Sequence, residues 1–90
     1  MPGQALPRPL RAACGIRIRA HRKALGWTQA VLSARSSVVN TQLSRMENGQ
    51  TAGLVASVLR LAWAMGVEPG SLLPDLEELT TMFGTAPEGK

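Results

Sequence analysis

The stretch that most constrains the fold is residues 28–49, which read TQAVLSARSSVVNTQLSRMENG. Thr28 can cap the free amides of a first helical turn, and the apolar residues after it predict a short helix over 28–35. Two serines at 36–37 break this helix, and a second helix is predicted over 39–47, closed by a glycine. Two short helices joined by a tight turn need a core beneath them, which the rest of the chain must supply.

The core of this 90-residue chain is expected to consist of packed helices. Apolar residues make up 44% of the chain, but it has no tyrosine, one phenylalanine and two tryptophans. Leu, Val, Ile, Ala and Met must therefore fill the interior, and this set suits helices better than a sheet. Because the length is typical of a single domain, we expect one all-α domain.

Further helices are predicted on both sides of the central pair. One spans about 11–25. Another spans about 54–65 and is apolar on more than one face, which is typical of a helix buried at the centre of a domain. No hydroxyl stands directly before it, so Thr51 is the nearest candidate cap. A short helix is predicted over 69–73, and DLEELTTMF at 75–83 predicts one more, amphipathic helix.

The domain is expected to span residues 11–83, between a flexible arm at 1–10 and a disordered tail at 84–90. The arm carries three prolines and a glycine, which disfavour regular structure. Arg8 and Arg11 could carry it into a DNA minor groove, but an arm without a role is the favoured interpretation.

The remaining composition indicates a soluble cytoplasmic protein. The single cysteine, Cys14, rules out an internal disulfide and fits a reducing compartment, and we expect a packed thiol. No apolar run approaches the roughly 20 residues that span a bilayer. The one histidine, His21, has no neighbours at metal-ligand spacing. We therefore expect no metal, no cofactor, no small-molecule ligand and no membrane partner.

Charge is distributed unevenly along the chain. Nine of the ten Lys and Arg residues lie in residues 1–60 beside one acidic residue, Glu47, for a formal charge of +8. Residues 61–90 hold five acidic residues and one lysine, for a formal charge of −4. This asymmetry suggests that the first two-thirds of the chain meets a polyanion. A solvated basic helix is the alternative interpretation of the same pattern.

The helix over 39–47 has one face suited to a core and one suited to reading DNA bases. Leu43, Met46 and Glu47 recur at three- and four-residue spacing and face inward. The opposite face holds hydroxyls, amides and one arginine, whereas an ordinary solvated face is usually rich in Lys and Glu. Arginine can donate bidentately to guanine, an amide can pair with adenine, and a threonine methyl can touch thymine. The residues expected to read bases are Asn40, Thr41, Gln42, Ser44 and Arg45.

Over residues 15–73 the sequence resembles the Cro and phage-repressor type of helix-turn-helix domain, the xenobiotic-response-element family. The matching text is GIRIRAHRKALGWTQ at 15–29, ENG at 47–49 and LRLAWAMGVEPGSLL at 59–73. The resemblance implies a five-helix, lambda-repressor-like fold, to which 75–83 adds a short extra C-terminal helix. It also implies that the second and third helices contact double-stranded DNA.

The resemblance assigns roles to single residues. Arg22 matches the first-helix arginine that pairs with the glutamate of the ENG block, here Glu47, and this pairing explains an acidic residue on an inward face. Gln29 and Asn48 match two amides that bind phosphates on either side of the reading helix. Gln29 also lies in a first helical turn, where free amides attract anions. The residues expected to contact phosphates are Gln29, Asn48, Thr28 and Gln50.

Two departures from the family pattern affect the turn and the fourth helix. Ser37 stands where the family usually has glycine, so a left-handed conformation there would cost about 1 kcal/mol. The fourth helix usually opens with proline and a hydroxyl cap, and here the corresponding positions are Gly53 and Leu54.

The pattern predicts a sequence-specific, DNA-binding transcriptional regulator: a small stand-alone repressor or controller protein that binds a two-fold operator as a homodimer. Its third helix would enter the major groove. The alternative is an antitoxin or interaction module of the same fold, with a toxin or second regulator as its partner. No enzyme is expected, because one histidine and one unpartnered cysteine give no catalytic constellation. The residues expected at the dimer interface are Trp63, Leu72, Leu76, Leu79, Met82 and Phe83.

Overall fold

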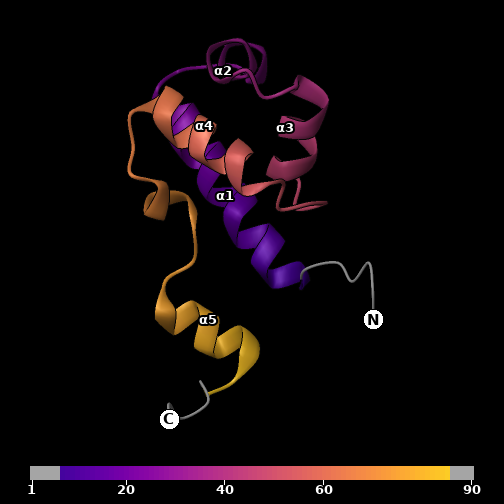
Figure 1. Ribbon diagram of the computed structural model, residues 1–90, viewed down its shortest axis with the longest axis vertical. Coiled ribbons are helices and arrows are strands. Elements are labelled where there is room, and N and C mark those ends of the chain that lie inside the picture. Colours follow the sequence, from indigo (N-terminus) through magenta and orange to yellow (C-terminus); the bar gives the residue numbers. More distant parts are fainter. Residues whose placement is uncertain (1–6, 86–90) are drawn as a thin grey trace.

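The computed structural model describes residues 7–85, which form five α-helices and one 3-10 helix (Figure 1). No strand occurs within that range, and the predicted all-α class is confirmed. The elements are α1 (Arg8–Ala24), α2 (Gln29–Ser36), α3 (Asn40–Glu47), α4 (Val55–Met65), the 3-10 helix η1 (Pro69–Leu72) and α5 (Leu76–Phe83).

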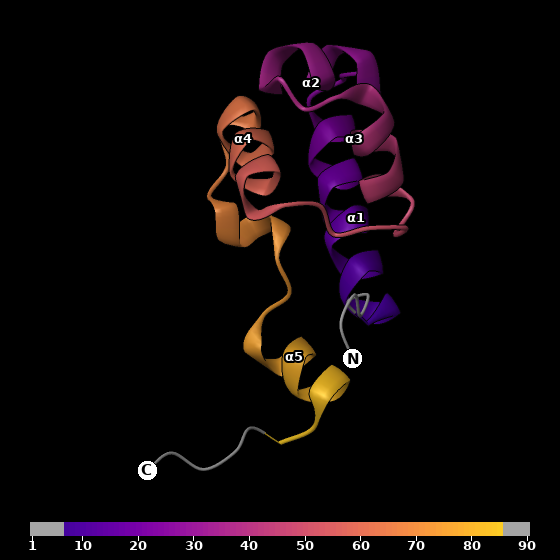
Figure 2. The same ribbon diagram turned by 45° about the vertical axis from the view of Figure 1, so that its right-hand side comes forward.

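The core lies where α1 to α4 and η1 meet. α1 packs against α3, α4 and η1, while α2 bridges α3 and α4. Figure 2 shows α2 across one end of the domain and α5 apart from α2, α3 and α4 at the other end. The buried core residues are Ile18, Leu32, Val38, Leu43, Met46, Val58, Leu61, Ala62, Met65 and Leu72.

The first helix begins three residues earlier than predicted. Pro7 is its N-cap and Pro9 lies in its first turn, where a proline costs no hydrogen bond because those N–H groups have no helical partner. Residues 8–10 are therefore helical, and the prediction of an arm over all of 1–10 is wrong for them. The rest of the predicted arm, 1–6, lies outside the described residues.

The turn between α2 and α3 forms without glycine. Ser37 adopts the left-handed conformation that the family pattern demands, with φ 63° and ψ 21°. Two neighbouring serines, Ser33 and Ser36, support this turn. Ser33 Oγ donates to the Val38 carbonyl at 2.6 Å, and Val38 N donates to Ser36 Oγ at 3.1 Å. These bonds satisfy the backbone after the strained residue, so they offset the cost of its conformation.

α1 and α3 approach each other closely at Gly15. A Cβ atom at this position would lie 2.3 Å from the Met46 carbonyl oxygen and 2.8 Å from that of Glu47. Both neighbours are backbone atoms that cannot rotate away. The missing side chain of Gly15 therefore sets the distance between the two helices.

The fourth helix buries only one of its faces. Val58, Leu61 and Met65 are buried, but Val55 is 76% exposed and Leu59 is 47% exposed. The prediction of a centrally buried helix is wrong, because nothing in residues 7–85 covers the second apolar face. Its start also differs: Thr51 Oγ1 accepts from Gly53 N at 3.1 Å rather than from α4, which has no side-chain cap.

The fifth helix is well capped but poorly packed. Asp75 and Glu78 form a capping box, in which each carboxylate accepts from the backbone N–H of the other residue. Glu78 also forms an ion pair with Arg17 of α1. No residue of α5 is buried. The described chain ends at residue 85, so the rest of the predicted tail, 86–90, lies outside it.

Candidate nucleic-acid interface

The outward face of α3 brings the predicted base-reading side chains together. Asn40, Thr41 and Arg45 are exposed, and Gln42 and Ser44 are half-buried at the edge of the same face. Hydroxyl, amide and guanidinium groups therefore lie side by side where the edge of a base pair could approach. The side chains that line an open hollow on this face are Val39, Thr41, Gln42, Arg45, Gln50 and Thr51.

The inward face of α3 is tied to α1 through Glu47, whose side chain has no exposed surface. Arg22 binds the carboxylate with two donors: Nε donates to Oε2 at 2.7 Å and Nη2 donates to Oε1 at 2.8 Å. Its third nitrogen, Nη1, donates to the Trp27 carbonyl at 2.8 Å. This bidentate pair connects α1, the α1–α2 loop and α3, and its planar geometry restricts how α3 can rotate.

The Glu47 carboxylate stays ionised in this cluster. Burial acts to raise the pKa of Glu47, but hydrogen bonds from Arg22, Gln29 and Arg19 together outweigh burial and hold the pKa below its ordinary value. The hydrogen bond to Glu47 also raises the pKa of Arg22. Both groups are therefore charged at neutral pH, and the pair is buried without a net charge.

Two amides predicted to bind phosphates flank this cluster. Gln29 Nε2 donates to Glu47 Oε1 at 3.0 Å and keeps a second amide hydrogen for another acceptor. Asn48 Oδ1 accepts from Arg19 Nη2 at 3.0 Å, so both hydrogens of its amide nitrogen remain available. Glu47 thus orients the Gln29 amide directly and the Asn48 amide through Arg19.

The other two predicted phosphate contacts lie beside these amides. Thr28 is the N-cap of α2, and its Oγ1 accepts from Val31 N at 3.1 Å, as its sequence position predicts. The hydroxyl hydrogen of Thr28 is not used by this bond. Gln50 is exposed just after α3 and donates from its backbone to the Arg45 carbonyl at 2.9 Å.

Sequence reasoning missed two arginines at this surface. Arg19 is 44% exposed in its side chain and reaches both Asn48 and Glu47, and Arg11 Nε donates to the Gly49 carbonyl at 3.2 Å. One signal could have revealed Arg19: it lies three residues before Arg22 and so shares its helix face. No sequence pattern indicated the contact of Arg11, because this contact depends on the path of the loop after α3.

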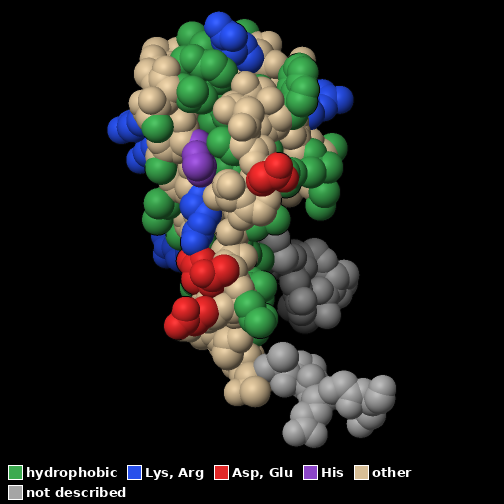
Figure 3. Space-filling model, turned by 90° about the vertical axis from the view of Figure 1, so that its left-hand side faces the viewer, with side chains coloured by type: hydrophobic (Ala, Val, Ile, Leu, Met, Phe, Trp, Pro, Cys, Tyr) green, Lys and Arg blue, Asp and Glu red, His purple; other side chains and the backbone are tan. Residues whose placement is uncertain are grey.

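Charge is distributed unevenly between the helices. On the face in Figure 3, two groups of acidic side chains lie at the α5 end and one more lies higher on the helical domain, where most of the basic side chains are found. α1 contains five arginines and one lysine but no acidic residue, whereas α5 contains Glu77 and Glu78 but no basic residue. An anionic partner is therefore attracted to the basic surface of α1 and repelled by the acidic first turn of α5.

Five of the six residues predicted at a dimer interface are available on the surface. Trp63, Leu76 and Phe83 are exposed, and Leu79 and Met82 are half-buried. Leu72 is the exception: it has 0% exposed surface because it completes the core between α1 and α4. The assignment of Leu72 to the interface is wrong.

Two further observations concern the described part of the chain. Within residues 7–85, no helix has the length and hydropathy needed to cross a membrane. In the same range, no group of three His, Cys, Asp or Glu side chains is arranged to hold a metal ion.

The fold and the polar outer face of α3 define the class of helix-turn-helix DNA-binding proteins. A family model described as a helix-turn-helix domain matches residues 13–76. The chain belongs to this helix-turn-helix family, and the resemblance inferred from the sequence is confirmed.

Two solved structures are similar to this chain. One is the restriction-modification controller protein C.AhdI from Aeromonas hydrophila, with 30% identity, a TM-score of 0.67, and coverage of 70% of this chain and 96% of that one. The other is the hypothetical transcription factor NHTF from Neisseria, with 24% identity, a TM-score of 0.70, and coverage of 92% and 97%. These matches confirm the predicted repressor-like fold. No match to a curated protein sequence reaches significance.

Proposed function

We propose that this protein is a sequence-specific transcriptional regulator that binds a two-fold DNA operator as a homodimer. α3 enters the major groove, and each copy reads one half-site. The observation that carries the proposal is the division of α3 into two faces. Its inner face is fixed to α1 by the Arg22–Glu47 pair, and its outer face presents five polar side chains, with the exposed Val39 just before the helix.

The flanking amides supply the second part of the mechanism. Gln29 and Asn48 would each donate to a phosphate oxygen, one at the start of α2 and the other at the end of α3. Such contacts fix the depth and register of α3 in the groove without reading sequence. Arg19 would add a charged phosphate contact beside Asn48, so that affinity falls as salt rises.

Support for a regulatory role comes from the similar structure whose name identifies a restriction-modification controller protein. That protein is covered almost completely by a domain of this kind. In the proposed homodimer, the two half-sites would lie roughly 34 Å apart.

Selection of bound sequences from random double-stranded DNA, at a stated salt concentration, tests the proposal. A palindrome should be enriched, with half-sites about one helical turn apart. Enrichment of a single half-site would contradict binding as a homodimer. If no sequence is enriched, the proposal is wrong, and a role in binding another protein becomes the better explanation of the fold.

Arg45→Ala is expected to lower specific DNA binding by about 1–3 kcal/mol and to relax discrimination at one base pair. Arg45 is the only charged side chain on the outer face of α3, and a guanidinium reads guanine through two hydrogen bonds. Binding to selected and single-mismatch duplexes measures the effect. Arg60→Ala, which removes an exposed arginine from α4, is the matched control and should leave that discrimination intact.

Gln29→Ala is expected to weaken binding to all sequences equally, by about 0.5–1.5 kcal/mol, because it removes a neutral phosphate contact. The salt dependence should stay unchanged, since no charge is lost. Arg19→Ala is the matched comparison and should reduce the slope of log affinity against log salt by about 1. A changed sequence preference in Gln29→Ala would contradict the phosphate role.

A further inference from the structure

The fifth helix leaves part of its apolar face uncovered. Leu76 is 74% exposed and Phe83 is 58% exposed, although α5 is amphipathic. A helix of eight residues is not stable by itself in water, and most of its stability must come from packing. Within residues 7–85, the main contact of α5 is with α1, where Glu78 pairs with Arg17. Leu79 and Met82 are half-buried, but Leu76 and Phe83 at the two ends of the apolar face are left uncovered in that range.

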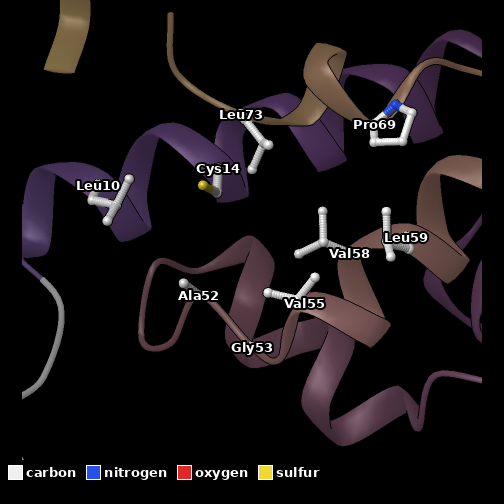
Figure 4. A pocket seen from close by; sticks show the side chains of 9 residues that line it. All are labelled: Leu10, Cys14, Ala52, Gly53, Val55, Val58, Leu59, Pro69 and Leu73. Carbon is white, nitrogen blue, oxygen red and sulfur yellow. The ribbon is translucent and has the colours of Figure 1, made fainter. Parts of the chain in front are cut away.

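An apolar groove on the same side of the molecule also lacks an occupant. It is a hollow of about 220 Å³ between α1, α4 and η1. In Figure 4, Leu10, Cys14 and Leu73 point into it from one side, and Val55, Val58 and Leu59 point into it from the other. Val55 and Leu59 remain exposed there, at 76% and 47%.

We propose that the apolar face of α5 from one copy of this chain occupies the groove of a second copy, and that the exchange is reciprocal. This inference rests on the homodimer of the proposed function and names its two contact surfaces. The contact buries Leu76 and Phe83 of each copy against Val55 and Leu59 of the other.

The short segment between the groove and α5 is compatible with a closed dimer. Leu73 lines the groove, and α5 begins only three residues later, so the donor helix and the acceptor groove are adjacent in each copy. When each copy both donates its helix and accepts the partner's helix across a single two-fold axis, the assembly closes as a dimer. A contact made in one direction only would join copies head to tail instead.

Within one copy, α5 is directed away from its own groove. The capping box fixes its first turn at Asp75, and the Arg17–Glu78 pair holds that turn against α1. Figures 1 and 2 both show α5 separated from α4, which forms one wall of the groove. The occupant that fits is therefore the same helix from a second molecule.

The charges of the two surfaces are complementary as well. α5 has acidic residues in its first turn, Glu77 and Glu78, and its cap is Asp75. The opening of the groove at Leu10 lies on the first turns of α1, where Arg8 and Arg11 are present and acidic residues are absent. An acidic helix that enters a groove with a basic rim gains attraction and a preferred orientation.

Two single substitutions, one on each surface, test the contact by sedimentation in the absence of DNA. Phe83→Lys places a cation at the C-terminal end of α5, and Val55→Glu places an anion at the first turn of α4. Both charges suit the helix dipole, and both positions are exposed, so each monomer keeps its fold. Circular dichroism checks that fold. Leu25→Glu, at an exposed leucine after α1, is the matched control.

The expected result is a dimer for the unmodified chain and the control, and a monomer for each test variant. Each substitution should raise the dimer dissociation constant by about a hundredfold or more, because it buries an unpaired charge. An equimolar mixture of the two test variants should dimerise again. In the mixed pair, one contact is unmodified and the other joins opposite charges.

Other outcomes overturn the inference. If only Phe83→Lys dissociates the dimer, α5 pairs with α5; if only Val55→Glu does so, the grooves face each other. Loss of the dimer in both variants without recovery in the mixture also contradicts a reciprocal exchange. An unmodified chain that sediments as a monomer removes the contact altogether. Because DNA is absent, each of these results is separable from failure to select an operator.

Discussion

Glu47→Ala is expected to lower the free energy of unfolding by about 3–5 kcal/mol, because it leaves the Arg22 guanidinium charged and buried without its partner. Arg22 is only 8% exposed, and two of its nitrogens donate to the carboxylate. The loss is a large part of the 5–15 kcal/mol that typically stabilises a whole domain. Urea unfolding followed by circular dichroism measures it.

The matched control is Glu77→Ala, which removes an exposed carboxylate from α5 and should leave the unfolding free energy unchanged. If Glu47→Ala unfolds at the same urea concentration as the unmodified chain, the buried pair does not stabilise this fold. Stability must be measured before DNA binding, since a partly unfolded variant would bind poorly for trivial reasons.

The pH dependence of stability gives the same prediction a second readout. The folded-state pKa of Glu47 is lower than its unfolded value, which is about 4.3 for a free glutamate. The ionised pair therefore stabilises the fold fully above that pH, and its contribution is lost as the pH falls through the folded-state pKa. Glu47→Ala should lack this part of the acid destabilisation.

Much of the fold follows from local sequence rules. Thr28 is followed by an apolar pattern of helical period, and it caps α2 as predicted. The boundary of α1 was harder to predict, since three prolines near the N-terminus indicate an arm and a proline also fits a first helical turn. Local rules identify a helix, but here they could not distinguish its first turn from the segment before it.

Burial was the property that local rules predicted least well. Val55 and Leu59 have the apolar character of core residues, yet both are exposed, because burial depends on whether another element covers the position. The prediction for Leu72 was wrong in the opposite direction, because Leu72 was assigned to an interface and is buried in the core. Both errors concern packing between distant segments, which helical periodicity does not encode.

Helical spacing predicted which residues share the outer face of α3, but not the contacts that connect them to other segments. The spacing on α3 places Asn40, Thr41 and Arg45 on one face, and the structure places them together. Sequence alone could not show that Gln29 and Arg19 share the Glu47 carboxylate, since these contacts join three separate segments. The cluster links the orientation of the predicted phosphate contacts to the stability of the core.

Gly15→Ala is expected to destabilise the protein by about 2 kcal/mol, and to lower its melting temperature by about 10 °C, although alanine is the better helix former. Helix propensity alone predicts a gain of about 1 kcal/mol at this position inside α1. Packing predicts the reverse, because the new methyl group would lie 2.3 Å from the Met46 carbonyl oxygen. The sign of the change in a thermal melt therefore decides between the two effects.

Gly70→Ala is the matched control, since a Cβ atom there meets no atom within 4 Å and the residue lacks a positive φ. It should leave the melting temperature unchanged or slightly raised. A Gly15→Ala variant as stable as the unmodified chain would contradict the close approach of α1 and α3.

The added methyl group should also move α3 away from α1 and lengthen the Arg22–Glu47 hydrogen bonds, which hold α3 in position. DNA affinity measured on the folded fraction should then fall as well, because the reading face of α3 is displaced relative to Gln29, which α2 positions.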